Sequence, residues 1–271
     1  MTDMPKYYPE DIIKETLKRI DKGVAIHTLA LWTKHPASLL LNPLYGFLKD
    51  IVNKGIQLYV QITVTGMGGM VIGDKIGGGW KIEPNAPAYG DALGTLPEII
   101  SLAGDARRIK IRIDPIVKVK DYCGKIYSNI GEFTKILEIS NSFGAGNFSF
   151  SLLEDNMHDK VGRRFKNIGC EILHFNLPER TAFGELIQGL QIKHKVKIYA
   201  CCVEGFDDSA CINGNLLSAS HAENEPADMG EPRRRPKCGC VKSIDLGGWP
   251  VKRCYTGCDY CYANPAFDFF V

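Results

Sequence analysis

Short apolar runs alternate with longer amphipathic segments along most of the chain. Residues 8–23 carry apolar side chains at helical spacing, with acidic residues near the start and Gly23 as a stop, which predicts an amphipathic helix. Residues 24–32 then form a largely apolar run, which is typical of a strand buried in a parallel sheet. The chain is therefore expected to open with a helix followed by a buried strand.

The same alternation recurs downstream. Further strands are predicted over residues 56–64, 109–115, 147–152 and 196–201, and residues 172–175 are a candidate for a short additional strand. Helices are predicted in a segment that begins between Pro36 and Pro43 and ends near Gly55, and over residues 96–102, 130–141, 159–168 and 182–193. Apolar strands that alternate with amphipathic helices favour a parallel sheet with crossover helices. We therefore expect an α/β fold that closes into a full or partial parallel (β/α) barrel.

Two stretches interrupt this pattern. Residues 66–79 are rich in glycine, but Val71 occupies the place of the last glycine of Gly-x-Gly-x-x-Gly, so a dinucleotide fingerprint is not supported. We expect a lid or hairpin over the strand ends there, with phosphate binding as the alternative. Residues 215–236 are polar and irregular. We therefore divide the chain into a barrel core (1–214), a connection (215–236) and a C-terminal segment (237–271).

Composition narrows the class of protein. The 271 residues are 45% hydrophobic and 24% charged, as in ordinary globular proteins, and the net charge of +2 neither demands nor excludes a nucleic-acid partner. No run approaches the roughly 18 apolar residues of a membrane span, and the first thirty residues hold charges throughout instead of an apolar signal region. Ten cysteines are then too many for a cytosolic enzyme unless several bind metal. We expect a reducing, oxygen-poor cytoplasm and no membrane partner.

Three cysteines lie close together near the C-terminus. Cys254, Cys258 and Cys261 are spaced so that one tight loop can present three thiolates to a single cubane iron–sulfur cluster. One iron of such a cluster stays open and can bind the amino and carboxylate groups of S-adenosylmethionine. The spacing resembles the radical S-adenosylmethionine signature, Cys-x3-Cys-x2-Cys. Zinc is the alternative metal, with Cys238 or Cys240 as the fourth ligand.

Four dispersed cysteines form a further candidate ligand set: Cys202, Cys211, Cys238 and Cys240, with Cys201 beside the first of them. They can supply a complete set of ligands for an auxiliary 4Fe–4S cluster or for zinc. The alternative is that some of these thiols are buried as small apolar side chains. Cys123 and Cys170 lie in or beside apolar segments, and we interpret them as structural.

Polar side chains gather where the predicted strands end. In parallel barrels and open parallel sheets, sites form at the carboxyl ends of the strands. The polar residues at those positions are Lys34 and His35, Gln61 and Thr63, Arg112 and Asp114, Ser149, and Cys202 and Glu204. Arg112 and Asp114 are two residues apart, so they share one face of their strand. They are expected to form an interior ion pair or to contact cofactor or substrate.

At this point the whole chain resembles a known family. The motifs that carry the resemblance are Trp32-Thr33-Lys34-His35-Pro36, Gln61-Ile62-Thr63-Val64-Thr65, Glu83-Pro84-Asn85, Arg112-Ile113-Asp114-Pro115, Cys202-Val203-Glu204, Cys238-Gly239-Cys240, Ser243-Ile244-Asp245-Leu246-Gly247 and Cys258-Asp259-Tyr260-Cys261-Tyr262-Ala263. In this order they are similar to the domain of unknown function 1848 family. That family is regarded as similar to radical S-adenosylmethionine enzymes, with the cysteine motif at the C-terminus. The resemblance thus implies a permuted barrel of the radical S-adenosylmethionine type.

The chain departs from that family at its start. Members usually begin with an extra strand that ends in two arginines, whereas here Thr2-Asp3-Met4-Pro5 follows Met1 directly. Either the start is late or the protein lacks one barrel strand. The family is also loosely similar to spore photoproduct lyase, which acts on DNA. Arg233-Arg234-Arg235 with Lys237 could accordingly contact phosphates, although a solvated charge run on a connection is commoner.

Together these features predict a radical S-adenosylmethionine enzyme of unknown substrate, oxygen-sensitive and supplied with electrons by a donor such as ferredoxin or flavodoxin. The expected cofactors are S-adenosylmethionine and one 4Fe–4S cluster on Cys254, Cys258 and Cys261, with a second cluster on the dispersed cysteines as a further expectation. Expected catalytic residues are Lys34, Arg112 and Asp114, and expected cofactor-binding residues are Gln61, Thr63, Ser149 and Glu204. The alternatives are a non-catalytic iron–sulfur electron-transfer protein and a zinc-stabilised binding module.

Overall fold

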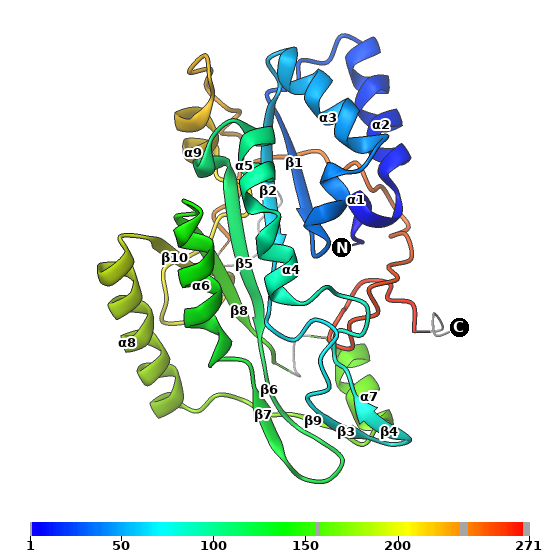
Figure 1. Ribbon diagram of the computed structural model, residues 1–271, viewed down its shortest axis with the longest axis vertical. Coiled ribbons are helices and arrows are strands. Elements are labelled where there is room, and N and C mark those ends of the chain that lie inside the picture. Colours follow the sequence, from blue (N-terminus) through cyan, green and yellow to red (C-terminus); the bar gives the residue numbers. More distant parts are fainter. Residues whose placement is uncertain (1, 155–157, 233–237, 268–271) are drawn as a thin grey trace.

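A five-stranded parallel sheet forms the centre of the molecule (Figure 1). A computed structural model describes residues 2–154, 158–232 and 238–267. The strands are β1 (Thr28–Thr33), β2 (Gln57–Thr63), β5 (Ile109–Ile116), β8 (Asn147–Leu152) and β10 (Lys197–Ala200). Their spatial order, β1-β2-β5-β8-β10, follows the chain, and every neighbouring pair is parallel. The five predicted strands and the α/β class are confirmed.

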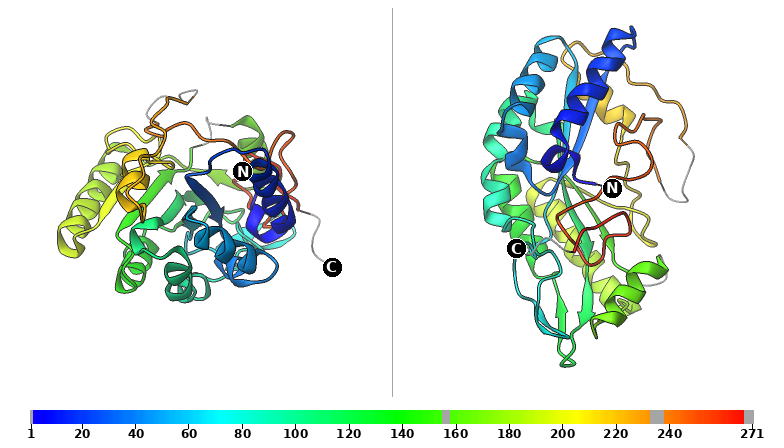
Figure 2. Two further views of the ribbon diagram at one scale, coloured as in Figure 1. Left: turned by 90° about the horizontal axis from the view of Figure 1, so that it is seen from above. Right: turned by 90° about the vertical axis from the view of Figure 1, so that its right-hand side faces the viewer.

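The sheet is open rather than closed. Within the described ranges, β1 and β10 each pair with one neighbour in this sheet, so the full barrel is not formed. Seen from above, the sheet curves with an outer layer of helices around it (Figure 2, left). The architecture is therefore an open parallel α/β sheet.

Most of the helices cover one face of the sheet (Figure 2, right). The helices are α1 (Met4–Tyr7), α2 (Pro9–Asp21), α3 (Leu44–Asn53), α4 (Tyr89–Gly94), α5 (Leu96–Ala103), α6 (Glu132–Ser142), α7 (Asp159–Asn167), α8 (Leu177–His194) and α9 (Gly214–Ser220), with 3-10 turns at Pro36–Leu40 and Ala106–Arg108. Helix α8 begins earlier than its apolar spacing predicted. Asn176 and Glu179 form a capping box at its start, and Pro178 lies in the first turn, where a proline is tolerated. In the part of the chain that is described, no helix is both long and apolar enough to cross a membrane.

Two small antiparallel sheets extend beyond the central one. The glycine-rich segment forms the hairpin of β3 (Gly73–Lys75) and β4 (Gly78–Trp80). Strands β6 (Lys118–Lys120), β7 (Ile126–Ser128) and β9 (Glu171–Ile172) form the other. The predicted hairpin and the short candidate strand near residue 172 are thus present, whereas β6 and β7 were not predicted.

The two faces of the central sheet differ in polarity. On β5, Ile109, Ile111 and Ile113 are fully buried against the helices. The alternating residues of β5 point to the opposite face, where they include Lys110 and Arg112. The described residues from 238 onward, orange to red, lie on that opposite side (Figure 2, right). We call this polar side the inner face, and it is where the candidate site forms.

Candidate functional site

Residues 254–261, here called the terminal cysteine loop, form a compact turn with backbone hydrogen bonds at its base. The Cys254 N–H donates to the Asn264 carbonyl at 2.8 Å, and the Ala266 N–H donates to the Cys254 carbonyl at 2.8 Å. Gly257 has a φ of +69°, and a Cβ there would lie 2.9 Å from the Ala266 carbonyl oxygen. Glycine before the second cysteine is therefore required by both backbone conformation and space.

Side chains distant in sequence fix this loop on the segment that follows the hairpin. The Trp80 indole Nε1 donates to Asp259 Oδ2 at 2.7 Å, and the Asp259 N–H donates to the Ile82 carbonyl at 3.0 Å. Asn85 Nδ2 donates to the Tyr255 carbonyl at 2.8 Å. Because Trp80 and Ile82 are buried and Trp80 belongs to the hairpin, these contacts hold the loop in one place on the inner side of the sheet.

The three thiols of the loop differ in burial. Cys254 and Cys258 are 7% and 5% exposed, Cys261 is partly exposed, and none of the three is in a disulfide. Burial raises the pKa of Cys258, while the Lys34 ammonium acts to lower it. The Cys254 thiol donates to Thr256 Oγ1 at 3.6 Å. Three free thiols in one loop beside a cation are a donor set that suits an iron–sulfur cluster.

Glu83 connects the loop to the end of β1. Its carboxylate is 2% exposed and accepts hydrogen bonds from Lys34 Nζ at 3.0 Å, Thr65 Oγ1 at 2.8 Å and the Tyr260 hydroxyl. Burial acts to lower the pKa of Lys34, but the charges of Glu83 and Cys258 outweigh it and raise that pKa above its ordinary value. Lys34 is thus a charged, partly buried residue near Cys258, where the strand-end rule predicted a polar side chain.

A second contact joins the N-terminal segment to the loop. His35 Nε2 lies 3.0 Å from Thr256 Oγ1, and the Tyr7 hydroxyl lies 3.3 Å from both of these atoms. Burial, followed by the charges of Lys6 and Lys34, lowers the pKa of His35 to about 4. His35 is therefore neutral at pH 7 and can serve either as donor or as acceptor, depending on its tautomer.

The end of β1 itself is held by Asp3. Its carboxylate accepts from Thr33 Oγ1 at 2.9 Å and from the Lys34 N–H at 2.7 Å. Burial raises the pKa of Asp3 to about 6, and these hydrogen bonds oppose the rise. The Thr2-Asp3-Met4-Pro5 segment thus orders the backbone that carries Lys34 and His35.

On the inner face of the sheet, the predicted polar residues line up across three strands. Arg112 lies opposite Thr63 on one side and opposite Ser149 on the other in the strand register. Its guanidinium forms an ion pair with Asp114, whose second oxygen accepts from Ser151 Oγ. The predicted interior pair of Arg112 and Asp114 is present.

Gln61 lies in the neighbouring row and is fully buried. Its Nε2 donates to the Cys211 carbonyl at 2.7 Å, while its Oε1 has no hydrogen-bond partner in the described ranges. Arg112 Nε is likewise buried and unpartnered there. Buried polar atoms without partners are uncommon in folded proteins, so these two are candidates for contacts with a bound molecule.

A second set of thiols lies at the other end of this face. Cys201, Cys211, Cys238 and Cys240, here called the second cysteine group, form a chain of hydrogen-bonded neighbours in which Cys211 contacts Cys201 and Cys240, and Cys240 also contacts Cys238. The backbone N–H groups of Cys211 and Ile212 donate to Cys240 Sγ at 3.1 and 3.4 Å. The hydrogen bonds from Cys201 and Cys240 lower the pKa of Cys211, helped by the charges of Arg112 and Lys110.

Three of the four predicted dispersed cysteines are therefore brought together, and Cys201 joins them. The Cys201 N–H continues the ladder by donating to the Phe150 carbonyl at 2.7 Å, so Cys201 shares the inner face with Tyr199. Cys202 follows with a φ of 55°, and the hydrogen bond with Cys211, followed by burial, raises the pKa of Cys201. Glu204, predicted to bind cofactor, is exposed in the turn that follows.

Charged residues connect the two sets of thiols. Burial acts to lower the pKa of Arg112, but Asp114 and then Cys211 and Cys201 raise it above its ordinary value. Asp114 also acts on Lys34, which lies near Cys258. The pair of Arg112 and Asp114 thus interacts electrostatically with both ends of the inner face, with Cys211 and Cys201 at one end and with Lys34 at the other.

Sequence reasoning did not assign a site role to several residues near the two sets of thiols: Glu83, Thr65, Tyr260 and Lys110. Glu83 belongs to the Glu83-Pro84-Asn85 motif, and that motif was the available signal for it. Lys110 is two residues before Arg112 in the same strand and so shares its face, and that alternation was the available signal for it. Arg233-Arg234-Arg235 and Lys237, which were considered for phosphate contacts, lie outside the described residues.

The donor atoms of the thiols fit metal chemistry, yet they are not converged. Over the ranges that the structure covers, no three His, Cys, Asp or Glu side chains are arranged as a ready metal site. Binding would therefore require rotation of cysteine side chains about their Cα–Cβ bonds.

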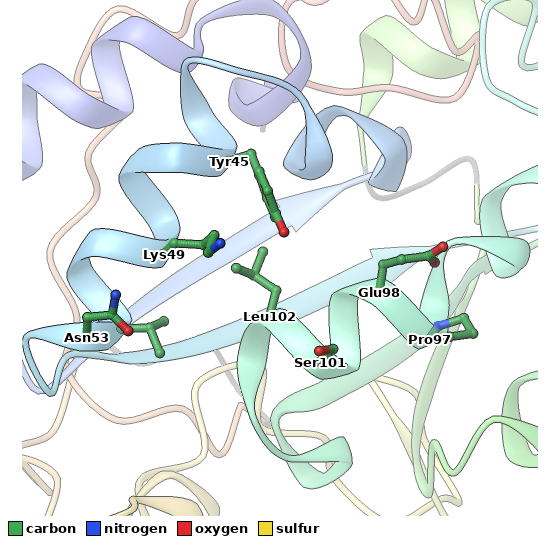
Figure 3. A pocket seen from close by; sticks show the side chains of 8 residues that line it. Tyr45, Lys49, Asn53, Pro97, Glu98, Ser101 and Leu102 are labelled. Atoms are coloured by element: carbon green, nitrogen blue, oxygen red, sulfur yellow. The ribbon is translucent and has the colours of Figure 1, made fainter.

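The cavities lie elsewhere. One of about 530 Å³ lies between α3 and α5 in the outer helical layer, lined by Tyr45, Lys49 and Glu98 among others (Figure 3). Another of about 520 Å³ runs along the edge strand β1, between α2 and residues 241–248. Neither contains any of the thiols, so the site is assigned from its chemistry rather than from cavity size.

Comparisons with known proteins confirm the family that the sequence motifs resemble. No curated protein and no solved structure matches the chain. A family model described as Domain of unknown function (DUF1848) matches residues 6–263, which is nearly the whole sequence. The chain therefore belongs to the DUF1848 family.

Proposed function

We propose that the protein is a radical S-adenosylmethionine enzyme whose cluster is held by Cys254, Cys258 and Cys261. The observation that carries the proposal is the docked terminal cysteine loop, in which three free thiols have Cys-x3-Cys-x2-Cys spacing and Cys258 lies near the partly buried Lys34 at the carboxyl end of β1. When bound, a 4Fe–4S cluster with one iron free of protein ligands supplies the electron that cleaves S-adenosylmethionine to methionine and a 5′-deoxyadenosyl radical.

The residues of the chain have separate tasks around that group. Lys34 places a positive charge beside Cys258, which favours the thiolate form that metal binding requires. Glu83 holds Lys34 and the Tyr260 hydroxyl, and so fixes the loop relative to β1. Tyr260 is itself kept neutral, because burial and then the charges of Cys258 and Glu83 raise its pKa.

The inner face supplies contacts for cofactor or substrate. Asp114 holds the Arg112 guanidinium in orientation. The Arg112 Nε–H has no partner among the described residues, so it can donate a hydrogen bond to a polar group of a bound molecule. The Gln61 Oε1 offers an acceptor one row away. Thr63 and Ser149 flank Arg112 and add hydroxyl groups. This arrangement suits a polar molecule, and the buried setting excludes water from the reacting atoms.

The test is production of 5′-deoxyadenosine. The protein is loaded anaerobically with iron and sulfide, mixed with S-adenosylmethionine and dithionite, and compared with Cys258→Ala and with Cys123→Ala, whose cysteine is exposed and distant from the loop in sequence. We expect product from the parent and from Cys123→Ala, and a fall to background for Cys258→Ala. A parent that carries a full cluster yet gives no product would overturn the proposal and favour an electron-transfer protein.

A further inference from the structure

We propose that the second cysteine group is a separate site for a single thiophilic metal ion, zinc, bound by the four thiolates of Cys201, Cys211, Cys238 and Cys240. This inference concerns a different part of the inner face from the terminal cysteine loop and does not rest on the radical S-adenosylmethionine proposal. Four cysteines are the complete ligand set of a closed, structural zinc site.

Contacts between the sulfur atoms favour one ion over a cubane cluster. Tetrahedral coordination at about 2.3 Å per Zn–S bond places the sulfurs about 3.8 Å apart, which is close to the separation of hydrogen-bonded thiols. Cys211 contacts Cys201 and Cys240 in this way, and Cys240 contacts Cys238. In a cubane cluster, four irons and bridging sulfides separate the cysteine sulfurs more widely. The contacts between neighbouring thiols therefore favour one ion over a cubane cluster, and the side chains must rotate to close their chain into a tetrahedron.

The backbone around Cys240 is also shaped for a thiolate. Two amide N–H groups, of Cys211 and Ile212, point at its sulfur at 3.1 and 3.4 Å. Such donors stabilise negative charge on sulfur and orient the ligand, whereas a neutral thiol packed as a small apolar side chain has no need of them. The pairing of Val241 N–H with the Ile212 carbonyl at 2.9 Å holds the two segments together.

Two cations complete the surroundings. Lys110 is 1% exposed, and its Nζ donates to Ser209 Oγ and to the Ala210 carbonyl, each at 3.0 Å. This places a fixed positive charge beside Cys211, and the Arg112 guanidinium adds another. A tetrathiolate zinc site carries a net charge of about −2, so neighbouring cations lower the cost of burying it.

The test uses a protein from which the terminal cysteine loop has been removed as a metal site. A Cys254→Ala, Cys258→Ala, Cys261→Ala variant is purified from zinc-containing medium, and its zinc, iron and acid-labile sulfide are counted. We expect about one zinc per chain, with no iron and no sulfide. A folded variant without metal, or one with several irons and sulfide, would overturn the proposal.

Ligand identity is tested by a matched pair in the same background. Cys201→Ala should weaken zinc binding by at least about 100-fold in competition with a chromophoric chelator, whereas Cys202→Ala should leave it within a few-fold. Equal losses in the two variants, or loss only in Cys202→Ala, would contradict the assignment of Cys201. Should the triple variant not fold, Co²⁺ titration of the metal-free Cys258→Ala variant replaces it: the visible bands of a thiolate-bound ion should persist when Cys202→Ala is added and be lost when Cys201→Ala is added, and the reverse pattern would contradict the proposal.

Discussion

The terminal cysteine loop and the second cysteine group are assembled in different ways. The loop places three thiols within residues 254–261, near the cations Lys34 and Arg164, and the Arg164 guanidinium donates to the Cys261 carbonyl at 3.0 Å. The second group collects four thiols from separate segments between residues 201 and 240, close to two cations. A single short loop reaches one side of a metal centre and leaves a position open, whereas separate segments can enclose one. The first arrangement suits chemistry at the metal, and the second suits stability.

The two regions also differ in what positions them. The loop depends on long-range contacts of side chains, above all those of Glu83 and Trp80. The second group depends on the ladder of β10 and on the pairing of residues 209–212 with 239–241. Changes at the docking contacts should therefore disturb the loop and spare the second group.

Removing the charge of Glu83 is expected to have the largest effect. Glu83→Gln leaves the partly buried Lys34 without its carboxylate partner, so the free energy of unfolding should fall by about 3–5 kcal/mol. The measurement is urea unfolding followed by circular dichroism. Glu138→Gln, which breaks an exposed pair with Lys193, is the control and should change little. A similar, small effect of both variants would show that the pair does not hold the loop.

The support of β1 is expected to depend on pH through Asp3. Its pKa is raised to about 6 from 3.8, so protonation stabilises the fold, and this contribution is present below pH 3.8 and lost as the pH rises through about 6. Asp3→Asn is neutral throughout and does not lose it. The variant should therefore gain about 3 kcal/mol relative to the parent between pH 4 and pH 7.

Urea unfolding of the parent and of Asp3→Asn at pH 4 and at pH 7 measures this gain. A hydrogen bond lost on substitution would change the free energy of unfolding by the same amount at both pH values. Asp91→Asn, at an exposed position, should show no such gain. A constant difference between Asp3→Asn and the parent would mean that Asp3 does not titrate in this range.

Alanine substitutions at two glycines of similar conformation distinguish backbone strain at positive φ from steric crowding of the Cβ atom. Gly257 and Gly23 have φ values of +69° and +71°, but a Cβ at Gly257 meets the Ala266 carbonyl oxygen at 2.9 Å, while a Cβ at Gly23 meets nothing within 4 Å. Gly23→Ala should cost about 1 kcal/mol. Gly257→Ala should cost about 1–3 kcal/mol more and lower the iron content of the loaded protein. Equal costs would argue against tight docking of the loop.

The smallest expected effect is a change in metal affinity at the second cysteine group when Lys110 loses its charge. Lys110→Met keeps the apolar stem but removes the charge beside Cys211, so metal binding there should weaken by about tenfold. Lys197→Met, at an exposed position of β10, should bind as the parent does. The affinities come from chelator competition. An unchanged affinity of Lys110→Met would show that the Lys110 charge does not contribute to metal binding at this site.

The sheet could be predicted from the sequence because its signal is local. Runs such as residues 56–64 and 147–152 are apolar enough to identify buried strands, and β2 and β8 match them closely. The short strands β6 and β7 carry polar side chains and depend on pairing with distant β9, so no local pattern marks them. The sequence does not show whether the sheet closes into a barrel, because closure depends on pairing between the two edge strands.

The candidate site was predictable where its residues are contiguous. The spacing of Cys254, Cys258 and Cys261 is visible in the sequence, as is the alternation that pairs Arg112 with Asp114. The approach of Glu83 to Tyr260, far apart along the chain, is a result of tertiary packing alone. Likewise Cys201 lies on the inner face because side chains alternate between the two faces along β10 and its continuation, and no sequence motif marks it.

The central claim is that the terminal cysteine loop holds a cluster with one iron open to S-adenosylmethionine. The most direct measurement is the electron paramagnetic resonance spectrum of the anaerobically loaded, dithionite-reduced protein before and after addition of S-adenosylmethionine. Zinc in the second cysteine group would be silent in this experiment. We predict that the signal of the reduced cluster changes its g values when the cofactor is added. An identical spectrum, from a protein with a fully loaded cluster on Cys254, Cys258 and Cys261, would contradict the claim.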